Sequence, residues 1–116
     1  MLMVNMVLLL FIVLGLGYLY NRKSFEPFST PEKLIYFYMN ECGHCQRFNP
    51  VWSDFVKKYQ GNVQLSKVER KQAKKELKVY GVQGFPTVVL VDDEGNYKTY
   101  NGPRNVNGLM KFVNNY

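Results

Sequence analysis

The sequence predicts an α/β fold: a central mixed sheet flanked by helices in the order βαβαββα, preceded by one N-terminal transmembrane helix. Three observations lead to this prediction. The first 20 residues carry no charged side chain. Runs of β-branched and aromatic residues then alternate with segments whose apolar residues recur at helical spacing, which is typical of strands joined by crossover helices. Two further runs flank the turn residues 93–96 (DEGN), which predicts a hairpin.

The segment 1–20 is long enough to span a bilayer as a helix. A hydrocarbon core about 30 Å thick needs about 20 apolar residues, so we predict a retained transmembrane anchor here. Tyr18 and Tyr20, followed by Arg22 and Lys23, form an interfacial aromatic and basic flank. The alternative is a cleaved signal peptide, but no basic start and no small-residue cleavage pattern accompany the segment. The basic flank favours a cytoplasmic location for the rest of the chain, with the ER lumen as the alternative.

A linker and a first strand–helix unit follow the anchor. Residues 21–33 contain prolines and small polar residues and are predicted to be a linker, which leaves a single domain at residues 34–116. Residues 34–39 (LIYFYM) form an apolar run typical of a strand buried on both faces. Apolar side chains at helical spacing up to Tyr59 predict an amphipathic helix of about four turns, and Pro50 inside it should kink it.

The middle of the domain is predicted to hold a second strand and a charged helix. Residues 63–69 (VQLSKVE) alternate imperfectly and predict the strand. Residues 71–80 predict the helix, which Gly81 closes. Its buried stripe is predicted to be Ala73, Leu77 and Tyr80.

The C-terminal part is predicted to be a hairpin and a closing helix. Residues 87–91 (TVVLV) are the most strand-like stretch in the chain, and the turn at 93–96 leads into a short strand at 97–100. After a break at 101–103, apolar residues recur at helical spacing. The residues predicted to face inward are Val106, Leu109, Met110 and Val113.

Cys42 and Cys45 form a Cys-x-x-Cys pair directly after the first predicted strand. Cys42 falls at a helix start, where free backbone N–H groups and the helix dipole favour a thiolate. Because a thiolate is the attacking species in thiol–disulfide exchange, we expect Cys42 to be the nucleophile and Cys45 to be the resolving thiol. His44 can donate a hydrogen bond to Cys42 or carry positive charge beside it, which predicts an oxidising pair.

Two other chemistries are compatible with parts of the sequence. A Cys-x-x-Cys pair is also half of a common zinc site, but the chain has no second pair, so we expect neither a metal nor any cofactor beyond the dithiol. The net charge of +6 is compatible with nucleic acid binding. However, Lys71, Lys74, Lys75 and Lys78 share one helix face without interleaved aromatics, which predicts a solvated face and no nucleic acid partner.

Phe85 and Pro86 precede the strand at 87–91. Proline cannot donate to a strand ladder, so the start of a strand is a permitted place for it. The alternative is a cis Phe85–Pro86 bond that holds a loop against the two sulfurs.

These features resemble the thioredoxin superfamily and, within it, the catalytic domains of protein disulfide isomerases. The resemblance runs from about residue 33 to 116 and rests on 42–45 (CGHC), on Pro50 and on 80–87 (YGVQGFPT). It implies a thioredoxin-like fold and a membrane-anchored protein thiol–disulfide oxidoreductase or isomerase. In that resemblance Phe85 and Pro86 are substrate-binding residues, and Pro86 presents the substrate backbone. The implied partners are cysteine-containing substrate proteins and a sulfhydryl oxidase or reductase, with membrane lipid at residues 1–20.

The chain also departs from the pattern of that family. Arg104 resembles an arginine that approaches the resolving thiol and lowers its pKa, or is a solvated loop cation. Glu41 stands where the family usually has tryptophan and is expected to oppose thiolate formation at Cys42. Tyr36 stands where the family has a buried carboxylate, so deprotonation of Cys45 should be slower. The first strand and helix of the family are missing, which predicts an exposed sheet edge.

These departures keep a second class of function open. A thioredoxin-fold scaffold or assembly component with little or no turnover fits the missing carboxylate and the open edge. Membrane-anchored thioredoxin-like proteins also occur among virion components of large DNA viruses, with the domain facing the cytoplasm, and this agrees with the basic flank.

Overall fold

The computed structural model describes residues 2–21 and 28–116, with side chains of the first helix described at residues 5–16. Within this range the predicted order βαβαββα is found after an N-terminal helix. The elements are α1 (Leu2–Asn21), β1 (Pro31–Tyr38), α2 (Gly43–Lys58), β2 (Gln64–Glu69), η2 (Arg70–Gln72), α3 (Lys74–Val79), β3 (Thr87–Asp92), β4 (Tyr97–Thr99) and α4 (Val106–Asn114).

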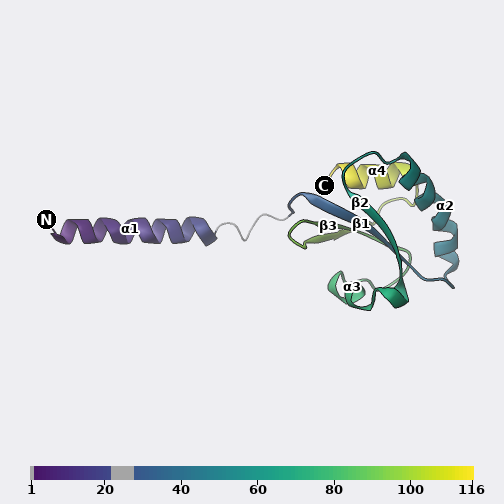
Figure 1. Cartoon of the computed structure of the whole chain (residues 1–116), viewed down its shortest axis with the longest axis horizontal. Helices are drawn as coiled ribbons and strands as arrows, with labels where there is room; N and C mark the ends of the chain where they lie inside the picture. The colour runs from purple at the N-terminus through teal and green to yellow at the C-terminus, as the bar shows by residue number, and fades with distance from the viewer. Residues whose placement is uncertain (1, 22–27) are drawn as a thin grey trace.

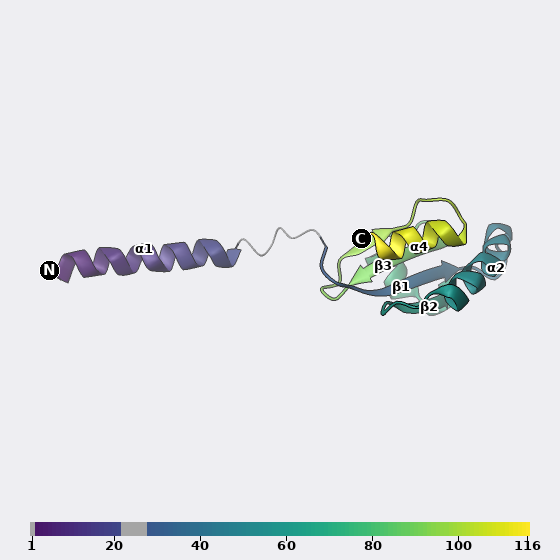
Figure 2. The ribbon, with the colours of Figure 1, turned by 90° about the horizontal axis from the view of Figure 1, so that it is seen from above.

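Helix α1 stands apart from the folded domain in both views (Figures 1 and 2). Residues 6–14 and 16 present large apolar side chains with 52% to 71% of their surface exposed. The predicted anchor at 1–20 extends beyond the described side chains, and its predicted flank at 18–23 lies outside them. Among the described residues, no helix has the length and apolar character that crossing a membrane requires.

The strands form one four-stranded mixed sheet in the order β2-β1-β3-β4. Strand β1 pairs in parallel with β2 and antiparallel with β3, and β3 pairs antiparallel with β4. The mixed sheet confirms the predicted fold class, but the expectation of parallel strands joined by crossover helices is correct only for β1 and β2. In the described part of the chain, β2 has β1 as its single neighbour and forms an edge, as predicted.

The connection from β2 to β3 returns the chain to the end of the sheet that it left. Glu69, the last residue of β2, lies opposite Tyr38, and Thr87, the first residue of β3, lies opposite Phe37. This return brings the segment before β3 to the end of β1 that precedes the cysteines.

The predicted helix at 71–80 is wrong in its length and continuity. The chain forms the 3-10 turn η2 and then the short helix α3, with Ala73 between them at φ −124° and ψ 28°, outside helical values. The Glu69 carboxylate accepts a hydrogen bond from the Lys71 N–H at 2.7 Å and caps the 3-10 turn. Ala73 and Tyr80 are buried, and Leu77 packs against their cluster, which confirms the predicted stripe.

The core lies on both faces of the sheet. Helices α2 and α4 cover one face and α3 covers the other (Figure 1). Because successive strand residues point to opposite faces, Leu34 and Tyr36 join the α2 and α4 side, and Ile35 and Phe37 join the α3 side. Each fully buried large apolar side chain stabilises the fold by about 1.5–3 kcal/mol.

Asp92, at the end of β3, is 1% exposed and organises the opposite end of the sheet from the cysteines. Its carboxylate accepts hydrogen bonds from the N–H groups of Ser29 (2.9 Å), Glu94 (2.9 Å) and Asn96 (2.8 Å) and from the Asn96 side-chain amide (3.0 Å). Burial alone would raise the pKa of Asp92, but these hydrogen bonds outweigh it and hold the pKa below its ordinary value. The carboxylate thus ties the β3–β4 turn to the segment before β1.

Candidate active site

Cys42 is the N-cap of α2. The chain leaves β1 and turns through a hydrogen bond from the Cys42 N–H to the Met39 carbonyl at 3.2 Å. Cys42 then keeps an extended backbone, φ −95° and ψ 116°, and its sulfur accepts the Cys45 N–H at 3.2 Å. A serine or aspartate oxygen makes the same contact in an ordinary N-cap. The cap geometry therefore places the sulfur against the unpaired N–H groups of the helix start.

The pKa of the Cys42 thiol is lowered. The main cause is a hydrogen bond with the Cys45 thiol, supported by the backbone N–H groups of Cys45 and His44 and by the charge of Arg104, while burial opposes the shift. A thiolate is stabilised by such donors and cations.

The pKa of the Cys45 thiol is raised. Cys45 is only 1% exposed, and burial is the largest cause, followed by its hydrogen bond with Cys42. A hydrogen bond from Tyr36 acts in the opposite direction but does not reverse the shift. The two thiols, both free in this structure, therefore differ in the direction in which their surroundings move the pKa.

The Phe85–Pro86 peptide bond is cis, which is the second of the two alternatives for this proline. The Cys42 thiol donates to the Phe85 carbonyl oxygen at 3.6 Å between sulfur and oxygen. The Thr87 hydroxyl donates to the Gly84 carbonyl at 2.6 Å and closes the loop. The loop that precedes β3 thus faces the sulfur that α2 presents.

Tyr36 is the residue that the sequence analysis placed at the position of a buried carboxylate. It is completely buried, and its hydroxyl lies 2.8 Å from Asn49 Oδ1 and 3.3 Å from the Cys45 carbonyl oxygen. Burial raises the pKa of Tyr36 far above its ordinary value, so the hydroxyl keeps its proton and acts as a donor, not as a base. The sequence did not single out Asn49; its position four residues after Cys45, on the same helix face, was the available signal.

The His44 imidazole does not make the expected hydrogen bond to Cys42. Its Nδ1 lies 2.8 Å from a guanidinium nitrogen of Arg47. Arginine is always a donor, so Nδ1 must accept and carry its lone pair. The contact of His44 with Cys42 runs through its backbone N–H instead. The physical reason is helical geometry, which makes residues three apart neighbours.

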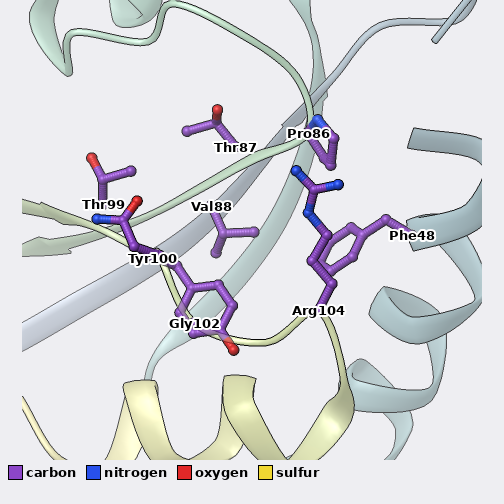
Figure 3. Close-up of a pocket in the computed structure, with 9 residues that line it drawn as sticks. Phe48, Pro86, Thr87, Val88, Thr99, Tyr100, Gly102 and Arg104 are labelled. Atoms are coloured by element: carbon purple, nitrogen blue, oxygen red, sulfur yellow. The ribbon is translucent and has the colours of Figure 1, made fainter. Parts of the chain in front are cut away.

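Arg104 lies in the loop between β4 and α4 and extends towards Pro86 beside the Phe48 ring (Figure 3). These residues line a hollow of about 260 Å³. The charge of Arg104 lowers the pKa of Cys42, and its expected effect on the pKa of the resolving thiol stays a prediction. Both thiols are buried, but Cys42 keeps 9% of its surface exposed and contacts the Phe85 carbonyl, whereas Cys45 keeps 1%.

Glu41 is exposed and shares a small hollow with Arg70 and Lys71. The charge of Arg104 lowers the pKa of Cys42, and the expected opposing effect of Glu41 stays a prediction. Across the described residues, no three His, Cys, Asp or Glu side chains lie where they could hold a metal ion together. The polar groups around the two thiols are the Tyr36 hydroxyl, backbone N–H groups and the Arg104 guanidinium.

A family model described as Thioredoxin matches residues 21–115. The chain belongs to the thioredoxin family. Among curated proteins, Protein disulfide-isomerase A3 of Gallus gallus is 34% identical over 80 residues, which cover 69% of this chain and 16% of that protein. The Thioredoxin domain-containing protein 5 homolog of Drosophila melanogaster is 30% identical over 87 residues, which cover 73% of this chain and 21% of that protein.

Solved structures share the fold. The first thioredoxin domain of mouse Protein disulfide-isomerase A4 matches with a TM-score of 0.63 and 23% identity, covering 84% of this chain and 69% of that chain. The J-Trx1 fragment of ERdj5 matches with a TM-score of 0.65 and 24% identity, covering 75% of this chain and 42% of that chain. The chain spans about a fifth of the length of the curated relatives it matches, so its activity is a matter for proposal.

Proposed function

We propose that this thioredoxin-family protein is a membrane-anchored protein thiol–disulfide oxidoreductase that works as an oxidant or isomerase. The observation that carries the proposal is the opposite shift of the two thiol pKa values, with the cis-proline loop 3.6 Å from the Cys42 sulfur. The lowered pKa makes Cys42 the nucleophile. The buried Cys45 attacks only after a mixed disulfide has formed.

The proposed exchange is reversible and transfers two electrons. The Cys42 thiolate attacks one sulfur of a substrate disulfide, that disulfide breaks, and its other sulfur leaves as a thiolate. Cys45 then gives its proton to this thiolate and attacks the Cys42 sulfur, which releases the second substrate thiolate to take a proton from water. Two electrons pass to the substrate, and Cys42 and Cys45 form a disulfide. The reverse sequence oxidises two substrate thiols, and a sulfhydryl oxidase or reductase resets the pair.

The lowered pKa of Cys42 supports the oxidising direction. A donor that stabilises the thiolate stabilises the reduced pair, which makes the disulfide a stronger oxidant. Equilibration of the full chain with glutathione buffers measures this directly. We expect a reduction potential near about −180 mV, and a potential near about −270 mV would identify a reductant.

Trapping tests the exchange itself. Cys45→Ala in the full chain should accumulate a mixed disulfide with a disulfide-bonded model protein, because the resolving thiol is gone. Adding Cys42→Ser to the same chain is the matched control and should abolish trapping. Absence of any mixed disulfide with Cys45→Ala would contradict the proposed activity.

Attachment through α1 is the second part of the proposal. Its support is the uncharged sequence at 1–20 and the continuous exposure of apolar side chains at residues 6–14. The full chain should stay with membranes after alkaline carbonate extraction, and release into the supernatant would contradict attachment. The proposed cytoplasmic side predicts digestion of the domain by protease added to sealed cytoplasmic-side-out vesicles, and protection would indicate the lumenal side.

A scaffold or assembly role is the second candidate. The observation that favours it is Tyr36, which places a neutral donor next to Cys45 where a proton acceptor would speed turnover. A scaffold predicts that Cys42→Ser leaves assembly of its complex intact and that Cys45→Ala traps nothing.

A further inference from the structure

Two hollows beside the cysteines share Phe48 and Arg104. The larger, about 260 Å³, lies between Pro86, the start of β3, the end of β4 and the loop before α4. The smaller, about 150 Å³, is completed by His44 and Arg47. Neither hollow has an acidic side chain in its lining. The surface next to the dithiol therefore carries two arginines without a carboxylate among the residues that line it.

Both arginines present N–H groups that can bind an anion. Each is exposed, and a guanidinium group keeps its charge at any physiological pH. Arg47 uses one nitrogen for His44 Nδ1, which leaves its other N–H groups available. Figure 3 shows the Arg104 guanidinium directed towards Pro86, with the Thr87 and Thr99 hydroxyls around the same hollow.

The hollows flank the reacting sulfur. Pro86 follows the Phe85 carbonyl that accepts from Cys42, and His44 contacts Cys42 through its backbone N–H. The charge of Arg104 acts on Cys42 as well. A polypeptide joined to Cys42 by a mixed disulfide must therefore run over one or both hollows with the residues next to its cysteine.

We propose that Arg104 and Arg47 form a subsite for a carboxylate of the substrate, which selects polypeptides with an acidic residue beside the reactive cysteine. The guanidinium fork matches a carboxylate in two parallel hydrogen bonds, and both arginines line the smaller hollow of about 150 Å³, which would receive that carboxylate. This inference rests on the proposed oxidoreductase function and names its substrate class. Glutathione offers the same carboxylate chemistry and is the alternative source.

The test compares matched peptides on the full chain in detergent micelles. Two cysteine peptides carrying the same leaving group on sulfur differ only in Glu or Gln beside the cysteine, and the rate of mixed-disulfide formation with Cys45→Ala is measured for each. The Glu peptide should react about 3- to 10-fold faster, because hydrogen bonds to charged groups are the stronger ones. The ratio cancels any effect of a variant on the thiolate itself.

Added variants locate the subsite. Arg104→Gln should bring the Glu/Gln ratio close to 1, and Arg47→Gln should lower it partly. Lys111→Gln, an exposed cation on α4 outside both linings, is the charge-matched control and should leave the ratio unchanged. If Lys111→Gln lowers the Glu/Gln ratio as much as Arg104→Gln does, overall charge and not a subsite explains the preference.

The outcomes separate this inference from the proposed function. If neither peptide forms a mixed disulfide, the oxidoreductase proposal fails. If both react at the same rate, the exchange stands and the carboxylate subsite is overturned. In a third arm, the rate with glutathione disulfide is measured; a loss of that rate with Arg104→Gln, without a change in the peptide ratio, overturns the polypeptide as the source.

Discussion

The buried polar groups at the two ends of β1 differ in charge and in how their pKa values are shifted. At its amino end, the Asp92 carboxylate holds a fixed charge with four hydrogen bonds, and its pKa is lowered. At its carboxyl end, the polar groups are two thiols and the neutral Tyr36 hydroxyl, and the pKa values of Cys42 and Cys45 move in opposite directions. Complete hydrogen bonding to a fixed charge holds the fold. Thiols with divergent pKa values suit the thiol–disulfide exchange that we propose for this site.

Replacing the Asp92 carboxylate should have the largest effect on stability. Asp92→Ala removes the acceptor of four donors, so the urea midpoint should fall markedly, while the alkylation of Cys42 under native conditions stays the same. The pKa of Asp92 lies below its unfolded value of about 3.9, so its contribution is complete above that pH and is lost as pH falls through the folded pKa.

The exposed neighbour Asp93 supplies the control for this comparison. Asp93→Ala should leave the urea midpoint nearly unchanged, and only Asp92→Ala should reduce the acid-side decline of stability. Equal midpoints for the two variants, measured by circular dichroism between pH 2 and pH 6 (a range set by ordinary carboxyl pKa values of about 4), would show that Asp92 is not a structural anchor.

At the other end of β1, Tyr36→Phe should produce a moderate kinetic effect. Losing the hydroxyl removes a hydrogen bond that lowers the pKa of Cys45, so release of the mixed disulfide should slow by about 2- to 10-fold. Formation of the mixed disulfide should not change. Rapid mixing with a labelled substrate separates the two steps.

Tyr38 offers a matched hydroxyl on the same strand, two residues away, and within the described part of the chain it makes no hydrogen bond to Cys45. Tyr38→Phe should therefore resolve the mixed disulfide at the wild-type rate. If Tyr36→Phe and Tyr38→Phe behave identically, Tyr36 is a packing residue only.

The smallest effect is expected for the His44 side chain. Because the imidazole contacts Arg47 and the backbone N–H contacts Cys42, His44→Ala should move the alkylation midpoint of Cys42 by no more than about half a pH unit. A shift of a full unit or more would show that the imidazole acts on the sulfur directly.

Local patterns in the sequence predicted most of the fold and the position of the dithiol. The strand of Leu34 to Phe37 is buried on both faces, and the helix that follows it makes Cys42 an N-cap, as the run of apolar residues predicted. The sequence did not predict the division of the helix after β2, because its apolar residues recur without a break. The division comes from the Glu69 cap on Lys71 and from the non-helical backbone of Ala73.

The surroundings of the site depended on contacts between distant segments. The pairing of Tyr36 with Asn49 joins β1 to α2, and the effect of Arg104 on Cys42 crosses from the last loop to the first helix of the domain. Spacing along the chain does not encode such contacts. The His44–Arg47 contact could have been predicted from helical spacing. The hydrogen bonds of Asp92 could have been predicted from its position at the start of a turn.

The divergence of the two thiol pKa values is tested most directly by alkylating the reduced full chain across a pH series and quantifying each cysteine by mass spectrometry. Cys42 should react with a midpoint below the ordinary cysteine pKa of about 8.5, and Cys45 with a midpoint above it. Coincident midpoints, or Cys45 reacting at the lower pH, would contradict the assignment of Cys42 as nucleophile and Cys45 as resolving thiol.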